Sequence, residues 1–163
     1  MSKQNFVQVA GIAAAIVVFL ALVDAYFFMK FQPNLSGIDQ IIHLGEFWIF
    51  AFAMIIVLAM TYYFLVEDLS ETVALALTSL VLVFTGWEDI IFYFVKGLPL
   101  LNPMATLPWL DTHPIIGTIS NTLHGALPTT FVGVGVTGAT LIASAFIGIG
   151  VLAIAIPLLL EVD

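Results

Sequence analysis

The residues of this chain that could do chemistry are acids and histidines within long apolar segments. Glu46, Glu88 and Asp89 interrupt stretches that otherwise carry almost no charge, and His43 lies three residues before Glu46. Carboxylates and imidazoles are ligands for zinc, iron and manganese. A charged side chain at the centre of a bilayer costs about 2.5–3.5 kcal/mol on insertion scales, so a group of such residues favours a functional site.

The composition identifies the medium in which these residues lie. Hydrophobic residues make up 62% of the 163 residues and charged residues only 9%, whereas about a quarter of an average soluble domain is charged. The sequence therefore predicts an all-α integral membrane protein. The formal net charge of −8 excludes nucleic acid as a partner, because a phosphate backbone needs a basic surface. The chain has no cysteine, which excludes thiolate ligands.

Four apolar segments are long enough to cross a bilayer as transmembrane helices. A helix rises about 1.5 Å per residue, and the hydrocarbon core is about 30 Å thick. The predicted spans are residues 6–31, 38–66, 70–96 and 129–160. They form a single membrane domain, 1–163, in which both chain ends lie on one side of the cell membrane. Lysines lie near both sides, so the positive-inside rule leaves the orientation open.

Residues 97–128 connect the third and fourth predicted spans and differ from the rest of the chain. Five of the seven prolines lie in this connection: Pro99, Pro103, Pro108, Pro114 and Pro128. They divide it into pieces too short to span a membrane. We expect a long structured loop that contains a short re-entrant or interfacial helix, residues 115–124, ended by Gly125. A connection of this length in a small protein is typical of a lid or a binding element.

Counting residues places carboxylates from three spans at one depth. Asp24, Glu46, Glu88 and Asp89 each lie seven or eight residues from the span end nearest the 97–128 loop. This corresponds to roughly 10–12 Å below that membrane boundary. Glu88 and Asp89 are adjacent and therefore about 100° apart around a helix. Only one of them can point at a given spot, and the other would orient a ligand or move protons.

Histidines complete the predicted site on the same side of the membrane. His43 shares a helix face with Glu46, because residues three apart are neighbours on a helix, and His124 lies just before the fourth span. The predicted ligands of a divalent metal (zinc, iron or manganese) are His43, Glu46, Glu88, His124 and Asp24. The predicted catalytic residues are Glu46, Glu88 and Asp89.

Three functional hypotheses fit this pattern. The first is a metal-dependent membrane enzyme that acts on a lipid-soluble small molecule, more readily a hydrolase than an oxidoreductase, because a bound metal lowers the pKa of water to about 7. The second is a proton- or cation-coupled transporter or channel subunit, which also uses acids at one depth. The third is a b-type haem protein with His43 and His124 as axial ligands.

Some polar residues also have an ordinary structural interpretation. Asp24 can pair with Lys30 or hydrogen-bond to a neighbouring backbone, and Asp111 and His113 can be solvated loop residues. The sequence leaves their roles open.

The fourth predicted span has small residues at a spacing of about four positions: Gly135, Gly138, Ala139, Ala143, Ser144 and Gly148. Small side chains let two membrane helices approach closely. We expect this face to pack either within the helix bundle or between the subunits of a homo-oligomer.

The predicted topology can be checked by cysteine labelling, because no native cysteine has to be removed first. Single cysteines replacing Asn34 and Met104 should react with a membrane-impermeant maleimide on one side of sealed vesicles. Cysteines replacing Ser2 and Ser70 should react only from the other side. Labelling of positions 34 and 70 from the same side would contradict the four-span topology.

Overall fold

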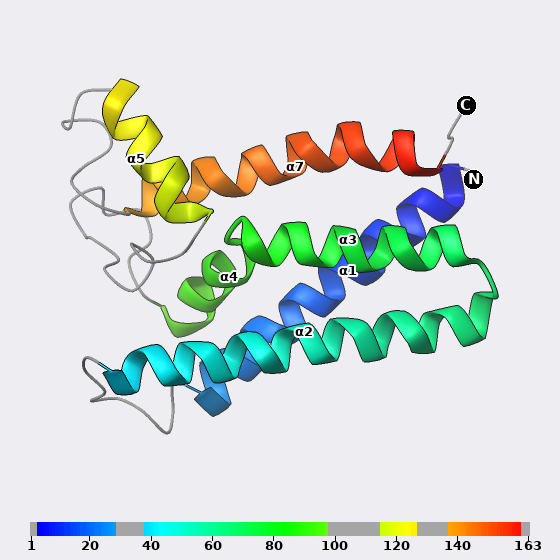
Figure 1. Cartoon of the computed structure of the whole chain (residues 1–163), viewed down its shortest axis with the longest axis horizontal. Coiled ribbons are helices and arrows are strands. Elements are labelled where there is room, and N and C mark those ends of the chain that lie inside the picture. The colour runs from blue at the N-terminus through cyan, green and yellow to red at the C-terminus, as the bar shows by residue number, and fades with distance from the viewer. Residues whose placement is uncertain (1–2, 29–37, 98–114, 127–136, 161–163) are drawn as a thin grey trace. The chain divides into compact units, whose positions relative to one another are not determined.

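A computed structural model of the chain describes residues 3–28, 38–97, 115–126 and 137–160. These residues form α1 (Lys3–Val23), the π-helix η1 (Asp24–Phe28), α2 (Ile38–Val66), α3 (Leu69–Phe84), α4 (Trp87–Lys96), α5 (Ile116–Ala126) and α7 (Gly138–Leu160) (Figure 1). The elements in the described part of the chain are all helical, in agreement with the predicted fold class.

Three of the described helical segments are long and apolar enough to cross a membrane. They are Phe6–Phe27, Glu46–Val66 and Gly138–Pro157, and α3 with α4 makes a fourth if the two are counted as one bent span. The helix α2 has the bounds of the second predicted span, 38–66. The chain is therefore compatible with a membrane protein of three spans, or of four with one span broken.

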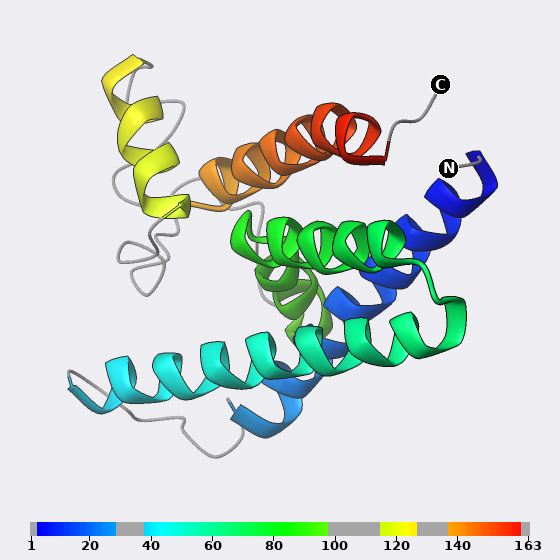
Figure 2. The same cartoon turned by 45° about the vertical axis from the view of Figure 1, so that its right-hand side comes forward.

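The third predicted span, residues 70–96, is not one continuous helix. The axes of α3 and α4 are bent by 58° at a short break between Phe84 and Trp87 (Figure 2). The prediction of an unbroken helix is wrong at this point. The helix is broken at the two residues between α3 and α4, Thr85 and Gly86.

Gly86 causes the change of direction. Its φ of 93° lies in the left-handed region, which a residue with a Cβ atom adopts only at a cost. The last turn of α3 is closed before the break, because Gly86 donates its N–H to the Val83 carbonyl at 3.1 Å. The Thr85 hydroxyl donates to the Val81 carbonyl at 2.7 Å. Backbone groups near the break thus keep hydrogen-bond partners, which an apolar medium requires.

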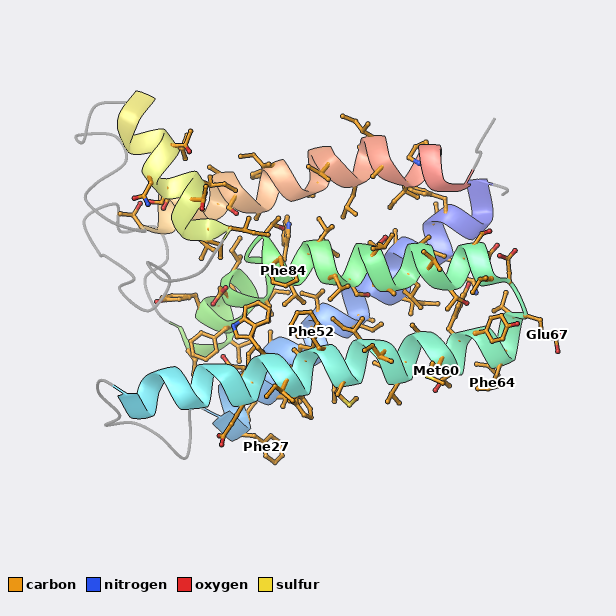
Figure 3. The ribbon with its side chains drawn as sticks, in the orientation of Figure 1. Phe27, Phe52, Met60, Phe64, Glu67 and Phe84 are labelled. Atoms are coloured by element: carbon orange, nitrogen blue, oxygen red, sulfur yellow. The ribbon has the colours of Figure 1, made fainter. Side chains whose placement is uncertain are left out.

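α2 and α3 form an antiparallel hairpin and lie side by side in both views (Figures 1 and 2). Only Glu67 and Asp68 separate the two helices, and Glu67 lies at the tip of the turn with a φ of 56° (Figure 3). Asp68 Oδ1 accepts a hydrogen bond from the Glu71 N–H at 3.0 Å, which caps the start of α3. The buried Tyr62 hydroxyl donates to Glu71 Oε2 at 3.0 Å and fastens the two helices together.

The outer face of α2 is apolar and exposed. Met60 and Phe64 project away from α3 (Figure 3), and both are more than half exposed, as are Ile49 and Leu65. Exposed apolar patches of this kind are unfavourable in water and mark a surface that contacts something apolar. The lipid of a bilayer meets this requirement.

The chain divides into two compact units, which are Met1–Leu80 with Ile154–Asp163, and Val81–Ala153. The first contains α1, η1, α2 and most of α3. The second contains the break after α3, α4, α5 and most of α7. The prediction of a single membrane domain stays a prediction.

The connection before α7 is only partly described. Helix α5, Ile116–Ala126, lies where a short helix was predicted at 115–124, but it continues through Gly125, so the prediction that Gly125 ends it is wrong. Residues 98–114 and 127–136, which hold the five prolines, lie outside the described residues. The re-entrant or interfacial position of this segment stays a prediction.

α7 approaches the break closely at one small residue. A Cβ atom on Gly148 would overlap Thr85 Oγ1 and would lie 2.8 Å from Thr85 Cβ. The Thr85 side chain is β-branched and stiff, so it cannot easily turn aside. Gly148 is therefore required for this contact, whereas Gly150 on the same helix is exposed and has no atom within 4 Å of its Cβ position.

Replacement of Gly148 by alanine should destabilise the protein. We expect a loss of about 1–3 kcal/mol, because overpacking a tight contact costs about this much. Gly150→Ala should be neutral or slightly stabilising, because alanine favours a helix over glycine by about 1 kcal/mol. Thermal unfolding in detergent, followed by circular dichroism, compares the two variants. Equal melting temperatures for both would show that Thr85 and Gly148 are not in contact.

Candidate functional site

Glu88 is the most buried of the predicted site residues whose side chains the structure describes. It is 4% exposed and lies in the first turn of α4, directly after the break. Phe92 and Tyr93 on the same helix are also buried. The N-terminal turn of a helix stabilises negative charge, because its first N–H groups have no partner within the helix. The break therefore allows a carboxylate in an otherwise apolar region.

Asp89 has a different environment from its neighbour. It is partly exposed, and its carboxylate is close enough to Tyr93, four residues further on, to interact electrostatically. The two adjacent acids thus differ in burial, as their separation of about 100° around a helix requires. Glu88 is the better candidate for a residue that binds a ligand directly.

Contacts of Gly86 and Trp87 with α5 and α7 fix the start of α4 within the second unit. Trp87 Nε1 donates to the Ala145 carbonyl on α7 at 3.0 Å, and the Trp87 ring lies edge-on to Phe146 with centroids 6.4 Å apart. A Cβ atom on Gly86 would overlap the Leu141 side chain and would lie 3.1 Å from Ile116 Cδ1. These contacts hold Glu88 in a defined position relative to α7 and α5.

The bend changes the depth at which counting places Glu88. Eight residues back from Lys96 correspond to roughly 12 Å along α4. Because α4 is bent by 58° from α3, this distance shortens to about 6 Å when it is projected on the α3 axis. The agreement in depth between Glu88 and the acids on the first two spans therefore rests on a straight helix that is absent.

Two other predicted carboxylates belong to the first unit. Glu46 is exposed where the apolar part of α2 begins. Asp24 is half-buried at the first residue of η1, and η1 packs against α2. Glu88 and Asp89 belong to the second unit. The convergence of all four carboxylates at one place stays a prediction.

The predicted histidine ligands are described only in part. The backbone of His43 lies in α2 and that of His124 in α5, but both side chains lie outside the described residues, as do Asp111 and His113 entirely. Among the side chains that the structure does describe, no three of His, Cys, Asp or Glu lie close enough to hold a metal ion. The metal site stays a prediction that depends on residues outside this set.

Sequence reasoning missed two polar features of the described helices. Glu71 is a second buried acid, 5% exposed, at the start of α3, although the sequence places it in an acidic turn. Tyr62 nine residues earlier is the signal that could have revealed it, because its hydroxyl provides the hydrogen-bond partner. The second is the π-helical turn that begins at Asp24. Turns of this type are rare and often occur at functional sites.

No protein-family model, curated protein or solved structure matches this chain. Among the described residues, Glu88 and the break that positions it are the strongest indication of a functional site.

The dependence of the site on the break can be tested at Gly86. Gly86→Ala should lower stability, and should also lower metal binding at the predicted site, because alanine is strained in a left-handed conformation and would also collide with Leu141. Gly97→Ala is the matched control: its φ of 63° is also left-handed, but its Cβ position has nothing within 4 Å. Melting temperature and metal content measure the two effects. Equal losses in both variants would show that packing at the break does not position Glu88.

Proposed function

We propose that this chain is a membrane-embedded, metal-dependent enzyme that acts on a lipid-soluble small molecule, as a hydrolase. The observation that supports the proposal best is the placement of Glu88, a carboxylate that is 4% exposed at a break within an apolar helix pair. A buried carboxylate needs a proton or a cation to offset its charge. A divalent metal satisfies this need and supplies chemistry.

The break itself favours a functional interpretation of Glu88. Irregular backbone within the depth of a membrane is tolerated only where it is buried in protein or lines a cavity. The α3–α4 break is of the buried kind, because residues 85–87 contact α5 and α7. A purely structural span would not need an acid at this position.

In the proposed mechanism Glu88 would hold the metal, and the sequence predicts Glu46, His43, His124 and Asp24 as further ligands. A bound divalent metal would supply water with its pKa lowered to about 7. Asp89, which is partly exposed, would hold and release a proton at its carboxylate. This chemistry would suit an ester or similar group that water cleaves, with the proton held by Asp89 passing to the leaving group.

A cation- or proton-coupled transporter is the second candidate, and one specific observation favours it. Discontinuous membrane helices with polar groups at the break are typical of transporter binding sites, and α3 and α4 form such a pair. The haem hypothesis depends on His43 and His124, whose side chains lie outside the described residues, and it stays a prediction.

Glu88→Gln is the decisive variant for the enzyme proposal. Glutamine keeps the size of the side chain but removes its charge, so metal binding and activity should be lost while the helices still form. Glu67→Gln is the control, because Glu67 is exposed in the turn between α2 and α3. Metal content by mass spectrometry of the purified protein gives the first measurement. An esterase assay with lipid-soluble substrates gives the second.

Three results would count against the proposal in different ways. Wild-type metal content in Glu88→Gln would remove Glu88 from the ligand set. A metal-free wild type that moves protons or cations across proteoliposomes would favour the transporter. An absorption band of haem in the wild type would favour the third hypothesis.

A further inference from the structure

Ser144 differs from the other buried serine and threonine residues of the described helices. It is 0% exposed on α7, and its Oγ atom has no hydrogen-bond partner within the part of the chain that the structure describes. Ser79 on α3 is equally buried, but its hydroxyl donates to the Leu75 carbonyl at 2.9 Å. Buried polar groups are nearly always hydrogen-bonded, so an exception indicates a water, an ion or a ligand.

Ser144 lies on the part of α7 that faces the α3–α4 break. Thr85 meets α7 at Gly148, and Trp87 donates to the Ala145 carbonyl. Ser144 is adjacent to Ala145 and four residues before Gly148, so it shares a helix face with Gly148. The residues involved all belong to the second unit, Val81–Ala153. The Ser144 hydroxyl is therefore at the level of the break, and Glu88 lies in the first turn of the helix that follows the break.

Thr85 adds a second hydroxyl oxygen at this place. Its side chain is 6% exposed, and its proton is committed to the Val81 carbonyl at 2.7 Å. A hydroxyl that donates its proton still has lone pairs on oxygen that can bind a cation. The atoms described here that could bind a metal ion are thus oxygens, from the Glu88 carboxylate and the hydroxyls of Thr85 and Ser144.

Oxygen donors select one class of metal. Carboxylate, carbonyl, hydroxyl and water oxygens suit hard cations such as magnesium and manganese, whereas zinc and iron are better served by imidazole or thiolate. We propose that Ser144 and Thr85 supply oxygen ligands to a hard divalent cation, Mn²⁺ or Mg²⁺, that is bound by Glu88. This inference rests on the proposed function, since it takes Glu88 as a metal ligand, and it narrows the metal to one class.

The test is a titration of the full-length protein with Mn²⁺ in detergent, followed by electron paramagnetic resonance of the free ion. Ser144→Ala should weaken Mn²⁺ binding by about tenfold or more, the usual loss when a metal site loses a supporting residue. Ser79→Ala should leave the affinity unchanged, because the Ser79 hydroxyl is used within its own helix. Circular dichroism confirms that both variants remain helical.

Ser144→Cys provides a readout that a structural role of Ser144 would not change. Cysteine is close to serine in size, and the chain contains no other thiol. A soft sulfur in place of a hard oxygen should weaken Mn²⁺ binding and strengthen Cd²⁺ binding. An unchanged ratio of the two affinities would overturn the inference, even if Ser144→Ala fails to fold.

The outcomes separate this inference from the proposed function. Wild-type Mn²⁺ affinity in Ser144→Ala, together with its loss in Glu88→Gln, would overturn the inference and leave the proposed function standing. A wild type that binds zinc but neither Mn²⁺ nor Mg²⁺ would do the same. Wild-type Mn²⁺ affinity in Glu88→Gln would overturn both.

Discussion

The contact between Thr85 and Gly148 is the constraint on which the arrangement of the second unit depends. Thr85 closes the end of α3 by donating to the Val81 carbonyl, and its side chain occupies the space that a Cβ atom on Gly148 would fill. The break can therefore lie directly against α7. From this position Gly86 meets Leu141 and Trp87 reaches the Ala145 carbonyl. The direction of α4, and with it the place of Glu88, follows from these contacts.

The two buried glutamates Glu71, in the first unit, and Glu88, in the second, show how one residue type can be used in two ways. Glu71 is 5% exposed and Glu88 is 4% exposed, and each lies in the first turn of a helix. Glu71 accepts a hydrogen bond from Tyr62, and its own N–H is bound by the Asp68 carboxylate. Both partners lie within nine residues of Glu71, and they give its burial a structural explanation. The contacts of Gly86 and Trp87, which precede Glu88, come from residues about 30 to 60 positions further along the chain, so the start of this helix is placed by the tertiary fold.

The sequence predicts a helix correctly where the length of an apolar run alone determines the bounds of that helix. The bounds of α2 agree with the predicted span because a long apolar run and an acidic turn define them. The break after α3 was not predictable in this way, since an isolated glycine in a helix costs only about 1 kcal/mol and is often tolerated. What decides at Gly86 is the tertiary contact with Leu141. Gly125 shows the opposite case, because it lies inside α5 where local preference predicted an end.

The candidate site was predictable only at the level of single residues. The choice of Glu88 followed from the cost of an acid in an apolar segment, and its burial agrees with that argument. The common depth of the acids depended on a straight third span, which the bend of 58° removes. Ser144 could not be singled out from the sequence, because its small size is typical of a helix-packing residue. What distinguishes it is a buried hydroxyl without a hydrogen-bond partner in the described part of the chain.

The Tyr62–Glu71 hydrogen bond has a consequence for how the chain enters the membrane during synthesis. Its partners are nine residues apart, and the turn between α2 and α3 contains two residues. Contacts between residues this close in sequence cost little loop entropy and form quickly. The Tyr62 hydroxyl can therefore hydrogen-bond to the Glu71 carboxylate before the later helices have left the ribosome. α2 and α3 would then insert as a pair, ahead of the segments that follow the break.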